Sequence, residues 1–489
     1  MLNSDIIGGT AIMKVKICVM SDVHGTLHRF QEMQYKIQQL KPDLVIQNGD
    51  FLQGDPSTYF YNTNHLPNPF LSLANRIVDV GVYGNHEFNE PLEKIKHTSA
   101  RFSHPIISCN LGDFAQPYTI HLINNFKIAI IGATTAMLKH WDEHNILLNL
   151  HVERATIAIK RTLRHVQQYE KPDFVIVAYH GGFIRDPKSN YVFSDNELEN
   201  EGNRILEELK GIDLLITGHQ HLILKGERNG IHYVQPGSHS KGFFEIDITI
   251  NNEKKGITST YHSVDPTASY PKEVEDWLNT KLVTLKKDYT YEGLLKSRLT
   301  SHPFIQLLHH MQIQQTGAQI SVCELMFHEK GGFKKDVTVQ DIWHNAHREV
   351  TLKVIELSGE EIRQLIEQSA AVFAVDSKGN IDFATNVYPN TIQPFQYDFW
   401  GGLDYIIQVS KPVYNRVIKL SYKGKPINKD DTFTVCLSSY RLTGYDFPLL
   451  TNKKALFETT LIYPALLEQF CRNLNEDDLK NYGHFKVIL

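Results

Sequence analysis

Five short stretches of this chain place side chains that can bind a metal ion directly after an apolar run. These side chains are carboxylates, an amide and imidazoles, namely Asp22, His24, Asp50, Asn85, His86, His180, His219 and His221. Imidazole nitrogen and carboxylate oxygen bind manganese, iron or zinc without any thiolate. A set of this size suits a pair of divalent ions, because one shared carboxylate can hold both ions close together.

The apolar runs before these side chains read as buried β-strands. They cover residues 15–20, 44–46, 77–83, 174–178 and 214–217. Apolar residues at helical spacing over 28–40, 150–169 and 196–209 alternate with these runs, which predicts a layered α/β architecture. Since side chains at strand ends converge in space, we expect the metal-capable residues to meet at the rim of a sheet.

The order and spelling of the five blocks resemble the calcineurin-like metallophosphoesterases, whose pattern runs Asp-x-His, Gly-Asp, Gly-Asn-His, His, Gly-His-x-His. The resemblance implies a four-layer α/β fold, with two sheets packed face to face and helices outside. It also implies which residues hold each ion: Asp22, His24 and His221 for one, Asn85, His180 and His219 for the other, with Asp50 between them. His86 is not a ligand in this family and donates to the phosphoryl group.

Such a pair of ions has a definite chemistry. Two cations roughly 3.5 to 4 Å apart lower the pKa of a bridging water and neutralise phosphoryl oxygens during in-line displacement. We therefore expect direct attack by a bridging hydroxide, with His86 as the main group outside the metal ligands. Manganese, zinc, iron, cobalt and magnesium all remain candidates for the two ions.

The residues after His86 depart from the family at one position. In the nucleotidase branch the motif continues Glu-Phe-Asp, and that Asp hydrogen-bonds the catalytic His; here the third residue is Asn89. An amide brings no charge, so the protonated form of His86 loses some support. Either the activity is modest, or Glu87 or Glu90 takes the place of the missing Asp.

Length and composition describe a globular chain of more than one domain. A chain of 489 residues is too long for one core, and its net charge of −5 gives no electrostatic reason to bind nucleic acid polymers or anionic membranes. No apolar stretch is long enough for a membrane span. The expected partner is a small nucleotide or other phosphoester, and the oligomeric state stays open.

The cysteines and the N-terminus bear on location. Five cysteines without close pairs argue against a disulfide framework. Residues 1–20 lack a basic leader with an apolar core, so we expect a cytoplasmic protein. Met13 is an alternative start, which would leave residues 1–12 as a disordered extension.

The second half of the chain has its own pattern. We expect a catalytic domain over 14–263, a charged linker helix over 264–298, and a smaller α+β domain over 299–489, with a capping box at Ser358 and Glu361. This half resembles the C-terminal domain of the bacterial 5'-nucleotidases and 2',3'-cyclic-nucleotide 2'-phosphodiesterases. The resemblance rests on segments 358–361, 397–405 and 439–448.

In that family the second domain stacks the nucleobase between two aromatic rings. Tyr397 and Tyr440 match these positions best, with Trp400 as a competitor for the first, and Asp446 is placed to hold the sugar hydroxyls. Lys334 stands where the family has an Arg, so bidentate recognition of phosphate is not expected there.

Three functions follow from these patterns. The preferred one is a two-metal phosphohydrolase that hydrolyses nucleotides as a phosphomonoesterase. The same metals also suit cleavage of a cyclic-nucleotide or other phosphodiester. A nucleotide-sensing protein with little turnover is the third hypothesis.

Overall fold

The computed structural model of the protein describes residues 5–7, 10–142, 146–194, 196–251, 254–265, 267–325, 329–346, 348–384 and 396–489. The chain divides into two compact units, residues 1–272 and 273–489, which are treated separately below. Among the described residues, no helix has both the length and the apolar character that crossing a membrane requires.

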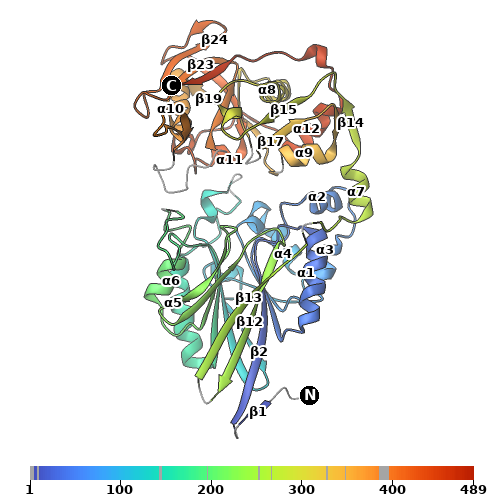
Figure 1. Cartoon of the computed structure of the whole chain (residues 1–489), viewed down its shortest axis with the longest axis vertical. Coiled ribbons are helices and arrows are strands. Elements are labelled where there is room, and N and C mark those ends of the chain that lie inside the picture. Colours follow the sequence, from blue (N-terminus) through green and yellow to red (C-terminus); the bar gives the residue numbers. More distant parts are fainter. Residues whose placement is uncertain are drawn as a thin grey trace. The chain divides into compact units, whose positions relative to one another are not determined.

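The first unit is built on two sheets (Figure 1). One sheet contains, in spatial order, β13 (Lys254–Ser263), β12 (Gly242–Asn251), β2 (Thr10–Met20), β3 (Leu44–Asn48), β4 (Val80–Val82) and β5 (Ile106–Ile107), with β1 (Asp5–Ile7) beside β2. The other contains β10 (Ile223–Arg228), β11 (Ile231–Pro236), β9 (Leu214–Ile216), β8 (Phe174–His180), β7 (Phe126–Thr134) and β6 (Tyr118–Ile123). Strands β2, β3 and β4 run parallel to one another, as do β8 and β9, whereas β12 pairs antiparallel with β2.

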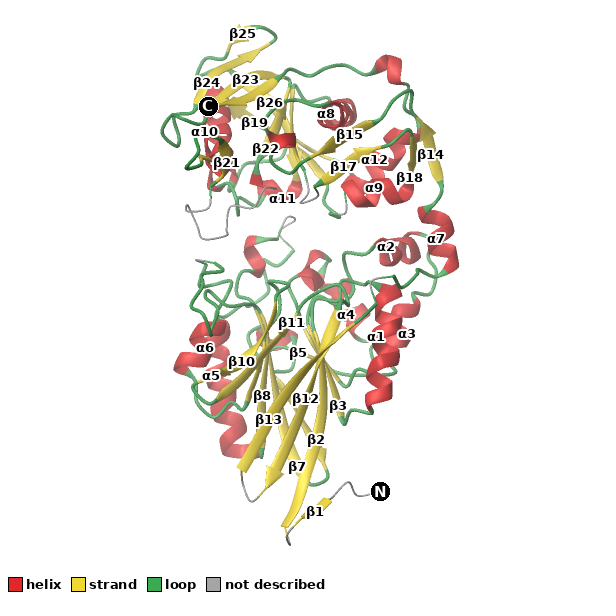
Figure 2. Ribbon diagram, in the orientation of Figure 1, coloured by secondary structure: helices red, strands yellow, loops and turns green. Residues whose placement is uncertain are grey.

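The two sheets pack face to face and helices cover their outer faces (Figure 2). Val19 and Ile46 from the first sheet share one buried core with Ile176 and Ile216 from the second. The helices of this unit are α1 (Leu27–Leu40), α2 (Pro56–Thr63), α3 (Pro69–Ala74), α4 (Leu92–Ser99), α5 (Ala155–His165) and α6 (Gly202–Glu208). Helices α5 and α6 pack on the second sheet, and α1 and α3 lie beside the first. The predicted four-layer α/β sandwich is therefore confirmed.

The second unit is α+β, as predicted. Its largest sheet contains β22 (Asp398–Gly401), β16 (Ile320–Glu324), β26 (Thr432–Ser438), β19 (Leu352–Ser358) and β27 (Phe457–Glu458). A second sheet contains β25 (Lys425–Pro426), β24 (Val417–Tyr422), β23 (Leu403–Gln408) and β28 (Phe485–Ile488). Its helices are α8 (Pro303–Thr316), α9 (Val339–Asn345), α10 (Gly359–Ser369), α11 (Ser439–Leu442) and α12 (Tyr463–Arg472). The capping box at the start of α10 is present, because the side chains of Ser358 and Glu361 each accept from the other's backbone N–H.

The expected linker helix over 264–298 is corrected by the structure. Only α7 (Lys272–Leu278) is helical for more than one turn there, and the residues after it form β14 (Lys281–Thr284) and β15 (Tyr289–Glu292). These strands pair with β18 (Asp336–Thr338) and β17 (Lys330–Phe333). Alternation in β15 buries Tyr289 and Tyr291 and exposes the residues between. The acidic residues Glu273, Glu275 and Asp276 belong to α7, whereas Lys286, Lys287 and Asp288 lie in the connection between β14 and β15. One charged run thus spans a short helix and the connection between two strands, which composition alone does not distinguish.

Two further expectations concern the N-terminus and the cysteines. Residues 1–4 and 8–9 lie outside the described residues, but Asp5–Ile7 pairs antiparallel with the start of β2, so the expected disorder over 1–12 is corrected for that segment. All five cysteines are buried free thiols. The cytoplasmic location stays a prediction.

Candidate metal centre

The metal-capable side chains sit at the carboxyl ends of neighbouring parallel strands. Asp22 and His24 follow β2, Asp50 follows β3, Asn85 and His86 follow β4, His180 ends β8, and His219 and His221 follow β9. Because adjacent parallel strands present their carboxyl ends at the same edge, the two facing sheets bring all of these residues together.

The backbone at this edge is strained. Asp22, His24, Asp50, His219 and His221 all have positive φ, between 51° and 70°, which costs a non-glycine residue about 1 to 2 kcal/mol. Such strain persists where the surrounding fold forces it, and it clusters at functional sites. Here it turns the side chains of successive loop residues toward one point.

Two glycines allow the loops to approach this closely. A Cβ at Gly84 would lie 2.2 Å from the backbone nitrogen of Asp50, and one at Gly49 would lie 2.2 Å from Nδ1 of His180. Neither position has room for any other residue. The glycine before each of these ligands is therefore a packing requirement.

One group of donors contains Asp22, His24 and His221. Nε2 of His24 lies 3.0 Å from Nε2 of His221, which in turn lies 3.5 Å from Oδ1 of Asp22. Ser21 donates to the other carboxylate oxygen of Asp22 at 2.6 Å and fixes its rotation. This is the first ligand set that the sequence predicted.

The second group contains Asn85, His180 and His219. Oδ1 of Asn85 lies 3.1 Å from Nε2 of His180 and 2.8 Å from Nδ1 of His219. Oδ2 of Asp50 lies 3.1 Å from Nε2 of His180 and 4.0 Å from Nε2 of His24. Asp50 therefore reaches both groups, as expected of a bridging carboxylate.

These distances fit the binding of two ions. Two donors that each bind one ion at about 2.1 Å can be no more than about 4.2 Å apart, and the donor pairs within each group are closer than that. Nδ1 of His24 donates to the carbonyl of Gln53 at 3.0 Å, and Nδ1 of His180 donates to the carbonyl of Asn48 at 2.6 Å. Since a carbonyl only accepts, both rings keep their Nε2 lone pair for a metal.

Asp50 and His180 are strongly paired in the protein without metal. Burial alone would lower the pKa of His180, but the Asp50 carboxylate beside it outweighs burial and raises that pKa to about 10. Burial alone would likewise raise the pKa of Asp50, but the neighbouring imidazolium groups hold it well below its usual range. The buried carboxylate is thus ready to accept a cation in place of the proton on His180.

His86 has a partner that sequence reasoning missed. Its Nδ1 lies 2.9 Å from Oε1 of Gln53 and 3.1 Å from Nδ2 of Asn89, which also donates to Gln53 at 2.7 Å. Burial lowers the pKa of His86 to about 4, although the Asp50 carboxylate opposes this. His86 is therefore neutral near pH 7 and held by two amides instead of a carboxylate.

The two glutamates considered as substitutes have other roles. Glu87 accepts from the backbone N–H groups of Asp50, Phe51 and Gly84, at 3.1, 2.7 and 2.7 Å. It therefore ties two ligand loops together. Glu90 pairs with Lys94 on the surface. Neither replaces the missing Asp, and that expectation is corrected in favour of Gln53.

Three other residues next to the site carry no sequence signal of their own. Glu199 accepts from Nε2 of His219 at 2.8 Å. The ring of Trp141 lies 5.3 Å from that of His219, and the ring of His239 stacks at 4.8 Å on that of His24. Each comes from a loop that lies outside the five motifs.

In the second unit, two of the predicted stacking residues are buried. Tyr397 has no exposed surface and packs on Phe373 and Phe399, each with ring centroids 5.0 Å away. Trp400, in β22, is 3% exposed. A ring with almost no exposed surface cannot stack on a nucleobase, so the stacking roles of Tyr397 and Trp400 are corrected to core packing.

The other predicted substrate residues lie in different surroundings. Tyr440 is half-buried at the start of α11, and the guanidinium of Arg348 lies 4.8 Å from its ring centroid. Asp446 pairs with Arg441 at 2.5 Å and accepts from Gln396 at 3.0 Å, so its carboxylate is already engaged instead of open to sugar hydroxyls. Lys334 is exposed just after β17.

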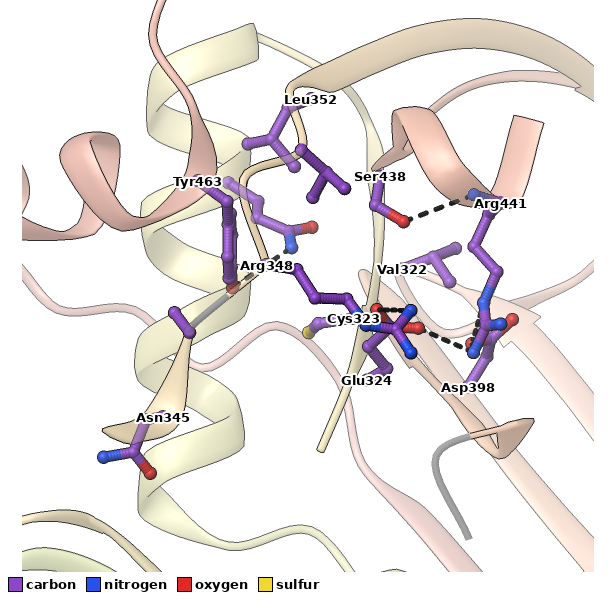
Figure 3. Close-up of a pocket in the computed structure, with 13 residues that line it drawn as sticks. Val322, Cys323, Glu324, Asn345, Arg348, Leu352, Asp398, Ser438, Arg441 and Tyr463 are labelled. Carbon is purple, nitrogen blue, oxygen red and sulfur yellow. Dashed lines mark hydrogen bonds and ion pairs between the residues drawn. The ribbon is translucent and has the colours of Figure 1, made fainter. Parts of the chain in front are cut away.

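A small pocket of mixed charge lies beside these residues (Figure 3). Its wall includes Glu324, Arg348, Asp398 and Arg441, and Figure 3 shows the two guanidinium groups on either side of Glu324. Arg441 is only 2% exposed and pairs with Glu324 at 2.7 Å and with Asp398 at 3.0 Å. The two guanidinium groups and the two carboxylates give this pocket both charges, so it suits a small polar group.

Comparison with known proteins identifies both units. Residues 15–222 match the calcineurin-like phosphoesterase family, and residues 283–451 match the 5'-nucleotidase C-terminal domain. The trifunctional nucleotide phosphoesterase protein YfkN of Bacillus subtilis is 24% identical over 88% of this chain, which spans 34% of that protein. A 2',3'-cyclic-nucleotide 2'-phosphodiesterase/3'-nucleotidase of Salmonella typhimurium is 24% identical over 84% of this chain and 75% of its own length.

Solved structures share the fold over almost the whole chain. A Staphylococcus aureus protein crystallised with alpha-ketoglutarate is 26% identical with a TM-score of 0.88, covering 98% of this chain and 100% of that one. The 5'-nucleotidase precursor of Thermus thermophilus, at 15% identity and a TM-score of 0.69, covers 97% of this chain and 99% of its own. With both family matches and the strand-end ligands in place, the chain belongs to the calcineurin-like phosphoesterases that carry a 5'-nucleotidase C-terminal domain, a family of metal-dependent phosphoester hydrolases.

Proposed function

We propose that this protein is a two-metal phosphohydrolase that acts on nucleotides. The observation that carries the proposal is the meeting of two donor groups, one around Asp22 and one around Asn85, with Asp50 within reach of both. Bound divalent ions would supply a water of lowered pKa as nucleophile and would neutralise the phosphoryl oxygens. The donors are nitrogen and oxygen only, which favours manganese, zinc, iron or cobalt over ions that prefer thiolate.

The residues of this chain would then position the substrate and move protons. His86 has its Nδ1 in contact with Gln53 and Asn89, so its Nε2 is the nitrogen left to face a phosphoryl or leaving-group oxygen. In the neutral imidazole, Nδ1–H donates a hydrogen bond to Gln53, and Nε2 has only a lone pair. Proton donation from Nε2 therefore requires the protonated imidazolium form of His86. We therefore infer that His86 works best below neutral pH.

The nucleotide is the substrate class that the second unit favours. The 5'-nucleotidase C-terminal domain match covers Tyr440 and Arg348, whose ring and guanidinium form a flat, cationic surface suited to a base and a phosphate. Tyr440 is the one predicted stacking residue with exposed surface, and we propose that it contacts the base.

A second activity has specific support. The Salmonella relative is named for 2',3'-cyclic-nucleotide 2'-phosphodiesterase as well as 3'-nucleotidase activity. The same ions would serve either bond, because both reactions displace an oxygen from phosphorus in line. We therefore propose 2',3'-cyclic nucleotides as a second substrate class, to be compared with nucleoside monophosphates.

The decisive experiment is a phosphate-release screen with added Mn²⁺. We expect phosphate release from nucleoside monophosphates. Cleavage of a 2',3'-cyclic nucleotide gives a nucleoside monophosphate and no free phosphate, so that product is assayed directly. Asp50→Asn should abolish turnover, while Asp113→Asn, at an exposed aspartate outside the site, should not. Nucleotide binding without product in equilibrium dialysis would instead favour a sensor, and full activity of Asp50→Asn would refute the metal centre.

A further inference from the structure

The imidazole of His219 is held from both ends. Its Nδ1 lies 2.8 Å from Oδ1 of Asn85, on the side of the second donor group, and its Nε2 lies 2.8 Å from Oε1 of Glu199. His24 and His180 are oriented the opposite way, with Nδ1 on a backbone carbonyl and Nε2 toward the site. His219 is therefore the one of these three ligands whose orientation depends on a side chain.

The backbone of Glu199 is fixed by buried groups. Its carbonyl accepts from the hydroxyl of Thr135 at 3.0 Å and from the hydroxyl of Tyr179 at 2.9 Å. Tyr179 is completely buried and directly precedes the ligand His180. The strand that supplies one metal ligand thus also anchors the residue that holds another.

The contact between Glu199 and His219 is shielded from water. The side chains are 15% and 12% exposed, and the Trp141 ring lies 5.3 Å from the His219 ring. A hydrogen bond to a carboxylate is stronger in such surroundings than in bulk water. The bond is therefore able to define the position of one proton on the ring.

We propose that Glu199 is a positioning residue for the second metal ion, acting through His219. A neutral imidazole carries one N–H, and the carboxylate at Nε2 keeps that hydrogen there, which leaves the Nδ1 lone pair for the ion. The carboxylate also makes the ring a stronger donor to a cation. This inference rests on the proposed two-metal function and adds which residue sets the affinity of the second ion.

Glu199 is not placed to bind that ion itself. Its Oε1 contacts Nε2, the ring nitrogen on the far side from Asn85. Among the described residues, the donor atoms that gather in this group come from Asp50, His180 and His219, together with Oδ1 of Asn85. Its effect on metal affinity is therefore transmitted through the ring.

The test is Mn²⁺ binding to the metal-free protein, measured by calorimetry and by the electron paramagnetic resonance signal of paired Mn²⁺. The wild type should bind two ions. Glu199→Ala should weaken one of them about 10- to 100-fold, leave the other unchanged, and lose the paired signal at limiting Mn²⁺. Glu199→Gln still accepts the hydrogen bond but has no charge, so its Mn²⁺ affinity at that site should lie between those of the wild type and Glu199→Ala. Glu197→Ala, at an exposed glutamate of the same loop, should bind Mn²⁺ like the wild type.

The outcomes separate the two proposals. Fewer than two ions on the wild type would overturn the proposed function and this inference with it. Two ions on the wild type and unchanged affinities in Glu199→Ala would overturn the inference alone. A lowered melting temperature of metal-free Glu199→Ala, together with weaker binding at both sites, would also overturn it, because that result indicates a role in folding.

Discussion

Asn89 lies beside His86 at the position where the nucleotidase branch has an aspartate. Its replacement by aspartate therefore leads to a quantitative prediction. Nδ2 of Asn89 lies 3.1 Å from Nδ1 of His86, so an aspartate in the same position places a carboxylate against that nitrogen. Position 89 belongs to neither donor group, so metal content should not change. The variant therefore adds a charge on one side of the His86 imidazole and removes the hydrogen bond from Asn89 to Gln53, while the two donor groups keep all their residues.

The size of the effect follows from the pKa of His86. Burial lowers it to about 4, so only about one molecule in a thousand carries the cation at pH 7. An opposite charge at hydrogen-bond distance raises a pKa by about 1 to 3 units. A raised pKa preserves the protonated form to higher pH. The protonated fraction of His86 at pH 7 therefore increases by a factor of about 10 at the lower end of this range and by a factor of several hundred at the upper end.

The assay is the pH dependence of kcat/KM, with metal content measured on the same samples. The limb on which activity falls as pH rises should move upward by about 1 to 3 pH units in Asn89→Asp. Gln53→Glu, which adds a carboxylate 2.9 Å from the same nitrogen, should move it in the same direction, and the uncharged Asn89→Ala should not. Bound ions act on all variants alike, so identical profiles at equal metal content would refute the role of His86 as a proton donor.

Three further predictions concern other parts of the molecule. Filling the second metal site should release about one proton per chain near pH 7.5, because Asp50 keeps His180 protonated and His180 must lose that proton to bind an ion. Calorimetry of metal binding in buffers of different ionisation enthalpy measures the number of protons released. Binding without proton release would contradict the pairing of Asp50 with His180. Arg441→Met leaves buried carboxylates unpaired and should lower the free energy of unfolding by about 3 to 5 kcal/mol in urea; a loss below about 1 kcal/mol would show the pairs to be dispensable. Tyr440→Ala should raise KM for nucleotides and spare an aryl phosphate, and equal effects on both would remove the base contact.

Secondary structure was predictable where the pattern was strong. The apolar runs ending at Met20 and Ala178 are buried strands, and the capping box at Ser358 starts a helix. The structure of the charged segment around Lys286 was not predictable, because the pairing partners of β14 and β15, such as Thr338 for Lys281 and Phe333 for Tyr289, lie far along the chain. A strand that depends on a distant partner leaves little trace in its own composition.

The surroundings of the residues proposed to bind substrate in the second unit were the least predictable. Tyr397 directly precedes β22 and Tyr440 lies in α11, and the ring of Tyr397 is in the core whereas Tyr440 is half-buried. Asp446 is taken up by Arg441, five residues before it in sequence but brought close by the turn between them. Burial of an aromatic ring or a carboxylate depends on what packs over it, and a local motif does not contain that information.

The sequence by itself determined that the proposed metal ligands gather at one edge, because each follows a recognisable strand, and parallel strands leave their carboxyl ends at one edge. The tertiary structure alone decided the partners of those ligands. Gln53 reaches His86 across 33 residues and Glu199 reaches His219 across 20, through loops whose paths are set by packing. The strands that precede the ligands are encoded by local apolar runs, whereas a contact between two loops exists only once both sheets have come together.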